Sequence, residues 1–165
     1  MVAVSDREHR KFMKAALSQA KKAYKKGEVP VGAVIVNDNK IISRSYNQKE
    51  GKMISVCHAE ITAIEKACRK MKNWRLNDCC LYVTLEPCMM CMGAIIESRI
   101  QRIVYGADNF HLGFLRILKE QFPLYVKNME IIPGIMAEES SSLLKEFFKA
   151  ERWLSTAESA RLEIE

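Results

Sequence analysis

Long apolar runs, proline and glycine are all scarce in this chain of 165 residues. No stretch approaches the roughly eighteen consecutive apolar residues that a membrane-spanning helix requires. The N-terminal stretch MVAVSDREHRKFMK has no apolar core of signal-peptide length. Four prolines and seven glycines are too few to suggest an extended disordered segment. We therefore expect a cytoplasmic protein that does not span a membrane.

The composition is that of an ordinary globular protein with an excess of positive charge. Hydrophobic residues make up 48% of the chain and charged residues 28%. A chain of this length can bury roughly two thirds of its unfolded surface. It has no repeat or linker, so we expect residues 1–165 to form one domain. The net charge of +6 permits a polyanionic partner, although solvated basic helix faces would account for it equally well.

The pattern of apolar residues predicts alternating helices and strands. Helical spacing predicts helices over residues 6–26, 58–71, 87–98, 110–121 and 137–155. Apolar and β-branched runs predict strands over residues 29–38, 40–47, 79–85, 102–106 and 129–134. The first two strands are expected to form a hairpin, and residues 48–56 a polar loop. This order favours an α/β fold with a five-stranded mixed sheet between helical layers.

The chain has six cysteines, and two of them stand at the start of a predicted helix. Three disulfides are possible in principle, but a reducing cytosol favours free thiols or metal ligands. Cys88 and Cys91 follow Pro87, whose fixed backbone angle suits a first helical turn, and their spacing places both sulfurs on one face. The dipole at a helix start favours thiolates, the form that binds metal.

A second stretch, SVCHAEITAI at residues 55–64, supplies a histidine at the start of another predicted helix. Two thiolates and one imidazole suit tetrahedral zinc and leave one position open, which is typical of a catalytic zinc site. We therefore expect His58, Cys88 and Cys91 to hold one zinc ion per chain. Cys57 could be a fourth ligand that closes the site, but adjacent residues rarely chelate one ion, so a packing or substrate-edge position is favoured.

Glu60 is the candidate proton carrier for a hydroxide generated on that zinc. In the middle of a helix, side chains two residues apart diverge by about 200°, which counts against pairing Glu60 with His58. At the first turn both side chains can reach past the helix end. A Cys-x-x-Cys pair alone could instead be half of a structural zinc knuckle, a redox pair or chance, so the prediction depends on the two halves occurring together.

The His-x-Glu and Pro-Cys-x-x-Cys halves resemble the signature of the cytidine deaminase superfamily. A closer resemblance is to the bacterial tRNA-specific adenosine deaminases, in the segments PVGAVIV (30–36), Asn47, HAEI (58–61), NWRL (73–76), LYVTLEPCMMCMGAI (81–95), SRI (98–100) and VYGA (104–107). After VYGA the chain reads DNFHLGFLRILKEQF, where the family usually carries a lysine- and glycine-rich turn. The segment LLKEFFKAERW (143–153) again resembles the family's terminal helix.

The resemblance implies a three-layer α/β/α fold of the cytidine-deaminase type, a homodimer, and conversion of the wobble adenosine of a tRNA anticodon to inosine. Zinc-bound hydroxide would attack the base, with Glu60 as the proton shuttle. Asn47 and the backbone N–H of Ala59 would hold the flipped base. The complete set of substrate contacts expected from the resemblance is Asn47, Ala59, Pro87, Asn109 and Phe148.

Two other functions stay open at this point. Deaminases of a free base, guanine or cytosine, share the same two zinc halves. A non-catalytic RNA-binding subunit is a different class of answer. It is disfavoured because such a subunit has no need of Glu60, which this chain retains beside all three expected ligands.

Overall fold

The computed structural model describes residues 5–109 and 113–162, and side chains as far as residue 150 except that of residue 116. The strands are β1 (Gly32–Asn37), β2 (Lys40–Tyr46), β3 (Cys79–Leu85), β4 (Arg102–Ala107) and β5 (Glu130–Ile132). The helices are α1 (Asp6–Tyr24), α2 (Lys49–Lys52), α3 (Ala59–Met71), α4 (Met89–Glu97), α5 (Leu115–Gln121), α6 (Pro123–Val126) and α7 (Ala137–Leu162). Over these residues, no helix is both long and apolar enough to cross a membrane.

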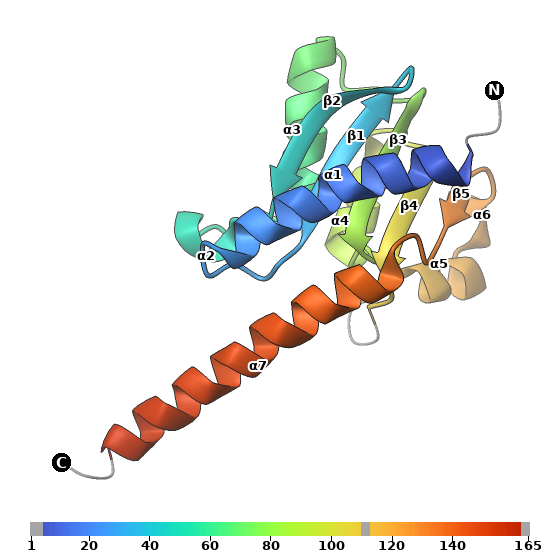
Figure 1. Ribbon diagram of the computed structural model, residues 1–165. Coiled ribbons are helices and arrows are strands. Elements are labelled where there is room, and N and C mark those ends of the chain that lie inside the picture. The colour runs from blue at the N-terminus through green and yellow to red at the C-terminus, as the bar shows by residue number, and fades with distance from the viewer. Residues whose placement is uncertain (1–4, 110–112, 163–165) are drawn as a thin grey trace.

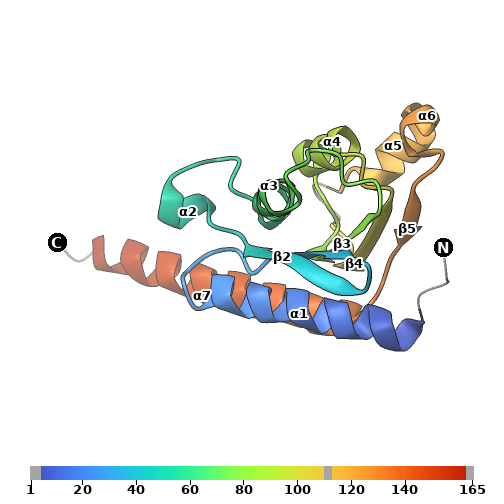
Figure 2. The ribbon, with the colours of Figure 1, turned by 90° about the horizontal axis from the view of Figure 1, so that it is seen from above.

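The strands form one mixed sheet in the order β2-β1-β3-β4-β5 (Figure 1). β1 is antiparallel to both β2 and β3, whereas β3, β4 and β5 run parallel. Helices α1 and α7 lie against one face of the sheet, and α3 and α4 cover the other (Figure 2). The predicted three-layer fold with a five-stranded mixed sheet is therefore confirmed.

Each face of the sheet buries its own apolar cluster, because side chains alternate along a strand. On β1, Ala33 and Ile35 pack in the cluster beneath α3 and α4. Val34 and Val36 pack with Phe12 in the cluster beneath α1. The central strands are therefore apolar at nearly every position, as their sequences predicted.

The close approach of α1 to the start of β1 depends on Gly32. A Cβ atom added there would lie 2.1 Å from the carbonyl oxygen of Ala16 and 2.4 Å from the amide nitrogen of Ala20, both backbone atoms that cannot move aside alone. We expect Gly32→Ala to lower the free energy of unfolding by about 1–3 kcal/mol or more, measured by urea unfolding. The control is Gly93→Ala in α4, where nothing lies within 4 Å of the added Cβ. There we expect a gain of roughly 0.5–1 kcal/mol, and equal effects at the two sites would contradict the close contact.

Four chain segments meet at one edge of the sheet. The start of β1 pairs with the end of β2, since Gly32 lies opposite Tyr46. The ends of the parallel strands β3 and β4 also lie side by side, with Leu85 opposite Ala107. β1 and β3 are antiparallel neighbours, with Ala33 opposite Val83, so all four ends lie at the same edge. The loops that carry the predicted site residues leave the sheet here.

The structure corrects the sequence prediction at four places. Residues 48–56 are not entirely loop, because α2 forms within them. Of the predicted helix over 110–121, residues 110–112 lie outside the described part of the chain. In the described residues the helix begins only at Leu115, since Gly113 forms an isolated β-bridge with Cys88. A further short helix, α6, follows with Pro123 in its first turn. The closing helix continues beyond the predicted residue 155 to Leu162.

Candidate metal centre and active-site cavity

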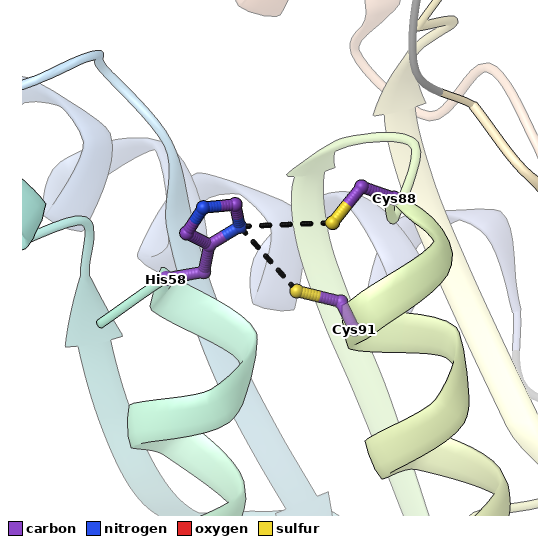
Figure 3. Close-up of side chains that lie close together, drawn as sticks. All are labelled: His58, Cys88 and Cys91. Carbon is purple, nitrogen blue, oxygen red and sulfur yellow. Dashed lines mark hydrogen bonds between the residues drawn. The ribbon is translucent and has the colours of Figure 1, made fainter. Parts of the chain in front are cut away.

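The histidine and the first cysteine of the predicted metal site occupy equivalent positions on two helices. His58 is the N-cap of α3 and Cys88 is the N-cap of α4. Both have extended backbone, with φ −69° and ψ 157° for His58 and φ −73° and ψ 172° for Cys88. Neither side chain caps its own helix, so both are available to point across the gap between the helices. Cys91 is the third residue of α4, and its sulfur points to the same place (Figure 3).

The sequence predicted that Cys88 lies within the first turn of the helix. In the structure Cys88 directly precedes the helix, as its N-cap. The residue that begins α4 is Met89, and Pro87 stands before the N-cap. The physical basis of the prediction still applies, because the exposed N–H groups of a helix start are close to an N-cap side chain.

The distances within this group fit a tetrahedral zinc ion. The Nδ1 atom of His58 lies 3.7 Å from the sulfur of Cys88 and 3.6 Å from the sulfur of Cys91. With Zn–S bonds of about 2.3 Å and Zn–N bonds of about 2.05 Å, a tetrahedron requires an S···N separation of about 3.6 Å. All three ligand atoms lie within 4.8 Å of one another. Among the described residues, this is the only group of three or more His, Cys, Asp or Glu side chains that could hold a metal ion.

The three side chains shift one another's pKa because they lie in contact. The contacts with Cys91 and His58 lower the pKa of Cys88 to about 4. The contact with Cys88 raises the pKa of His58 and that of Cys91. A low thiol pKa favours the thiolate, the form in which cysteine binds metal.

Glu60 is the second residue of α3, and only 4% of it is exposed. Burial raises the pKa of its carboxyl group above the usual range. Glu60 also lies close enough to the Cys91 thiol for each group to shift the pKa of the other. His58 stands outside the helix as its N-cap, so the divergence of about 200° expected for two mid-helix neighbours does not separate these side chains.

A cavity of about 610 Å³ opens over this group, within the usual size range for small-molecule sites. His58, Glu60 and Cys88 line it together with the loops at the sheet edge and one face of α7. Its apolar lining comprises Val29, Val31, Ala59, Leu85, Ala107, Leu144 and Phe148. Its other polar lining comprises Asn47, Lys49, Glu86, Asp108, Asn109, Ser141 and Lys145.

Four of the five predicted substrate contacts line this cavity. Asn47 and Ala59 are buried, and the backbone N–H of Asn109 donates to the carboxylate of Glu86 at 3.1 Å. Phe148 is 48% exposed at the rim and packs edge-on against the ring of Phe147. Pro87 is buried and does not line the cavity, although its two neighbours in sequence, Glu86 and Cys88, do.

Sequence reasoning missed Glu86 as part of the site. Its carboxylate accepts the backbone N–H groups of Asn109 and Leu115, at 3.1 and 3.3 Å. It therefore ties the segment after β4 to the end of β3, beside Cys88. The position of Glu86 directly before Pro87 and Cys88 could have indicated a role in the site. Its partners, the backbone N–H groups of Asn109 and Leu115, are too far along the chain to be recognised from the local sequence. The prediction likewise left out Lys49 and Lys145, which also line the cavity.

The other cysteines lie outside the candidate metal group of His58, Cys88 and Cys91. Cys57 is partly buried and is not part of that group in the described residues. Cys79 and Cys80 are buried in the core, where burial raises the pKa of their thiols to about 11 and about 12. Both thiols therefore stay protonated at neutral pH, as expected of core cysteines.

Comparison with known proteins identifies relatives over most of the chain. The profile of the MafB19-like deaminase family matches residues 7–152. A tRNA-specific adenosine deaminase of Bacillus subtilis is 41% identical over 142 residues, which are 84% of this chain and 87% of that protein.

Two solved structures are also similar. One, from a study of A-to-I editing by tRNA:A34 deaminases at the wobble position of transfer RNA, is 38% identical with a TM-score of 0.77, and the match covers 81% of this chain and 99% of the other. A guanine deaminase of Bacillus subtilis is 40% identical with a TM-score of 0.58, but the match covers only 61% of this chain and 64% of the other. The likeness to the tRNA:A34 deaminase therefore extends over more of the fold.

Proposed function

We propose that this chain, which belongs to the deaminase family of the tRNA-specific adenosine deaminases, converts adenosine to inosine at the wobble position of a tRNA anticodon. The observation that carries the proposal is that the buried Glu60 lines one cavity together with His58 and Cys88, the residues that form the candidate metal group with Cys91. Relatives named for this activity match 84% of the chain, which supports the choice of substrate.

His58, Cys88 and Cys91 would hold one zinc ion, because their donor atoms are of the types that zinc prefers and their separations suit a tetrahedron. When bound, zinc would act as a Lewis acid that lowers the pKa of a water molecule from 15.7 towards about 7. Three protein ligands would leave one of the four positions of a zinc ion for water, as hydrolysis requires.

Glu60 would carry the protons of the reaction. Its carboxylate would accept one proton from the attacking water and pass it to the ring nitrogen, then take the second proton of the same oxygen, from the hydroxyl group formed on the base, and pass it to the departing amine. The water oxygen becomes the carbonyl oxygen of inosine, and the amine leaves as ammonia, so one water is consumed. The raised pKa of Glu60 suits this work, since it makes the carboxylate a stronger base towards the attacking water.

The base itself would be held by groups at the cavity wall. Asn47 offers its carboxamide, and the backbone N–H of Ala59, at the first position of α3, belongs to the donors that a helix leaves without an internal partner. Asn109, Pro87 and Phe148 would contact the nucleotide or its neighbours, with Phe148 offering a ring on which a base can stack. A base in an anticodon loop is accessible because it need not leave a duplex.

The remaining expectations also become part of the proposal. Residues 1–165 would act as one cytoplasmic deaminase domain and associate as a homodimer. Apolar side chains close to the metal group in sequence support an association surface, since Met53 is 93% exposed, Val56 48% and Met89 63%. Such exposed apolar side chains are typical of surfaces that another chain covers.

The substrate assignment predicts a specific product. We expect the zinc-loaded protein to form inosine in an anticodon stem-loop RNA that carries adenosine at the wobble position, because the cavity opens beside α7 and can admit one base from a loop. The same protein should release no ammonia from guanine, cytosine or cytidine. Inosine is measured by nuclease digestion and liquid chromatography, and ammonia by a coupled enzyme assay.

The control RNA is a stem-loop with inosine already at the wobble position, which should yield no ammonia. Turnover of free guanine alone would replace the proposal by the guanine deaminase activity named for one structural relative. Binding of the stem-loop without turnover, in protein that contains zinc, would instead favour a non-catalytic RNA-binding subunit.

A further inference from the structure

Glu28 is a buried carboxylate that the proposed chemistry does not use. It lies in the connection between α1 and β1, and only 2% of it is exposed. Its Oε2 atom accepts hydrogen bonds from the Asn47 carboxamide and from the backbone N–H of Glu50, each at 3.2 Å. Its Oε1 atom accepts the backbone N–H of Gly51 at 2.7 Å. A buried carboxylate is costly unless donors surround it, and here three donors do.

The contact with Glu28 determines how Asn47 is oriented. A carboxylate only accepts hydrogen bonds, so the NH₂ end of the Asn47 carboxamide must face Glu28. The reversed orientation would place the carbonyl oxygen of Asn47 against a carboxylate oxygen. The backbone of Asn47 is also anchored, because its N–H donates to the carbonyl oxygen of Val31 at 3.0 Å. The rotation of the carboxamide is the freedom that remains, and Glu28 removes it.

Asn47 lines the cavity, whereas Glu28 lies behind it and is not among the lining residues. With one N–H of its NH₂ group bound to Glu28, Asn47 presents its carbonyl oxygen and its second N–H to a base in the cavity. A carboxamide oriented in this way can accept from one polar atom of a base edge and donate to another. A free carboxamide would have to be ordered each time a base binds, which lowers affinity or misplaces the base.

We propose that Glu28 is a positioning residue for deamination, whose carboxylate fixes the orientation in which the Asn47 carboxamide meets the substrate base. The proposal rests on the proposed function, because it gives Asn47 the role of a base contact. Glu28 also holds the first turn of α2, so a purely structural role is the alternative that an experiment must separate.

A double-mutant cycle separates the two roles. The rate of inosine formation in the anticodon stem-loop is measured for the wild-type protein, Glu28→Ala, Asn47→Ala and the double variant, all loaded with zinc. We expect Glu28→Ala to lower kcat/KM by about 10- to 100-fold in the wild-type background. In the Asn47→Ala background the same change should alter kcat/KM less than about twofold, since the group that Glu28 positions is already absent. A structural role would give the same loss in both backgrounds and would overturn the proposal.

Glu8→Ala is the matched control. Glu8 also accepts backbone and carboxamide N–H groups, from Ser5 at the start of α1 and from Asn39, but it does not line the cavity. This variant should keep the wild-type kcat/KM. If Glu28→Ala does not fold, Glu28→Met replaces it in the cycle, because methionine fills a similar space but offers Asn47 no oxygen acceptor.

A second readout does not require turnover. In ¹H–¹⁵N NMR spectra the side-chain NH₂ signals of Asn47, assigned by their loss in Asn47→Ala, should be protected from exchange in the wild type and in Glu8→Ala. They should lose that protection in Glu28→Ala or Glu28→Met, in which the acceptor is absent. Unchanged protection would overturn the proposal. If the wild type does not deaminate the RNA, the proposed function fails, and these signals alone decide whether Glu28 orients Asn47.

Discussion

Replacing Glu60 by glutamine is expected to lower kcat for deamination of the anticodon stem-loop by about 10²- to 10⁴-fold. The carboxamide has nearly the same shape but cannot take a proton from water and return it to the base. Because Glu60 is not one of the three expected ligands, the zinc content should stay at one ion per chain. The measurement is single-turnover inosine formation together with metal analysis of the same sample.

The same variant should not lose stability. Burial raises the pKa of Glu60 above its ordinary value of 4.5, so the folded state disfavours the ionised form. The folded protein is therefore less stable, at every pH above that ordinary value, than it would be with a neutral side chain there. Metal-free Glu60→Gln should accordingly unfold at the same temperature as the wild type at pH 7, or at a higher one. A lost activity then cannot be ascribed to unfolding.

Glu65→Gln provides the control on the same helix. Glu65 is exposed and pairs with Arg69 four residues later, at 2.6 Å. An exposed pair of this kind is worth well under about 1 kcal/mol, so both activity and stability should stay near the wild type. If Glu60→Gln kept activity within tenfold of the wild type, Glu60 would not be the proton carrier, and another group at the cavity would have to be sought.

Much of the candidate site could be predicted because its parts are local. The spacing of Cys88 and Cys91, and that of His58 and Glu60, are short-range patterns that place reactive groups at helix starts. The convergence of the two halves is not local. It follows from the sheet, which sets the two helix starts at the same edge, and the sequence suggested it only because the ligand types of the two halves together suit one zinc ion.

The residues that sequence reasoning missed act over long separations. The donors to Glu28 lie 19 to 23 residues away, at Asn47, Glu50 and Gly51. Glu86 accepts from Leu115, 29 residues further along the chain. A carboxylate that becomes buried by such contacts looks, in sequence, like any other surface glutamate. The same contacts explain why α2 was missed, since its first backbone N–H groups are capped by Glu28 and by no neighbour in sequence.

Strands were predicted more closely than helices in the second half of the chain. The strand at Cys79–Leu85 has the predicted bounds, because a buried β-branched run has few alternatives. By contrast, the helix expected from residue 110 begins only at Leu115. Leu115 donates to Glu86, and Gly113 pairs with Cys88 across the site. The contacts of this segment with Glu86 and Cys88 therefore outweigh its local preference for a helix.

Replacing Cys88 by alanine is expected to abolish zinc binding and, with it, all activity. Cys88 is one of the three expected ligands, and its loss leaves only His58 and Cys91 as donors. Changing a residue that merely orients a ligand costs about 10–100-fold in metal affinity, so loss of a ligand itself should exceed that. Zinc affinity is measured by competition with a chromophoric chelator, and we expect the purified variant to contain little metal.

Cys57→Ser is the matched control, because Cys57 is adjacent to His58 in sequence but lies outside the metal group among the described residues. It should keep one zinc ion and near wild-type activity, since three ligands and one open position remain. If Cys57→Ser lost zinc as Cys88→Ala does, Cys57 would be a fourth ligand. The site would then be closed to water, and a structural metal would replace the catalytic one, because hydrolysis requires a position that the protein does not fill.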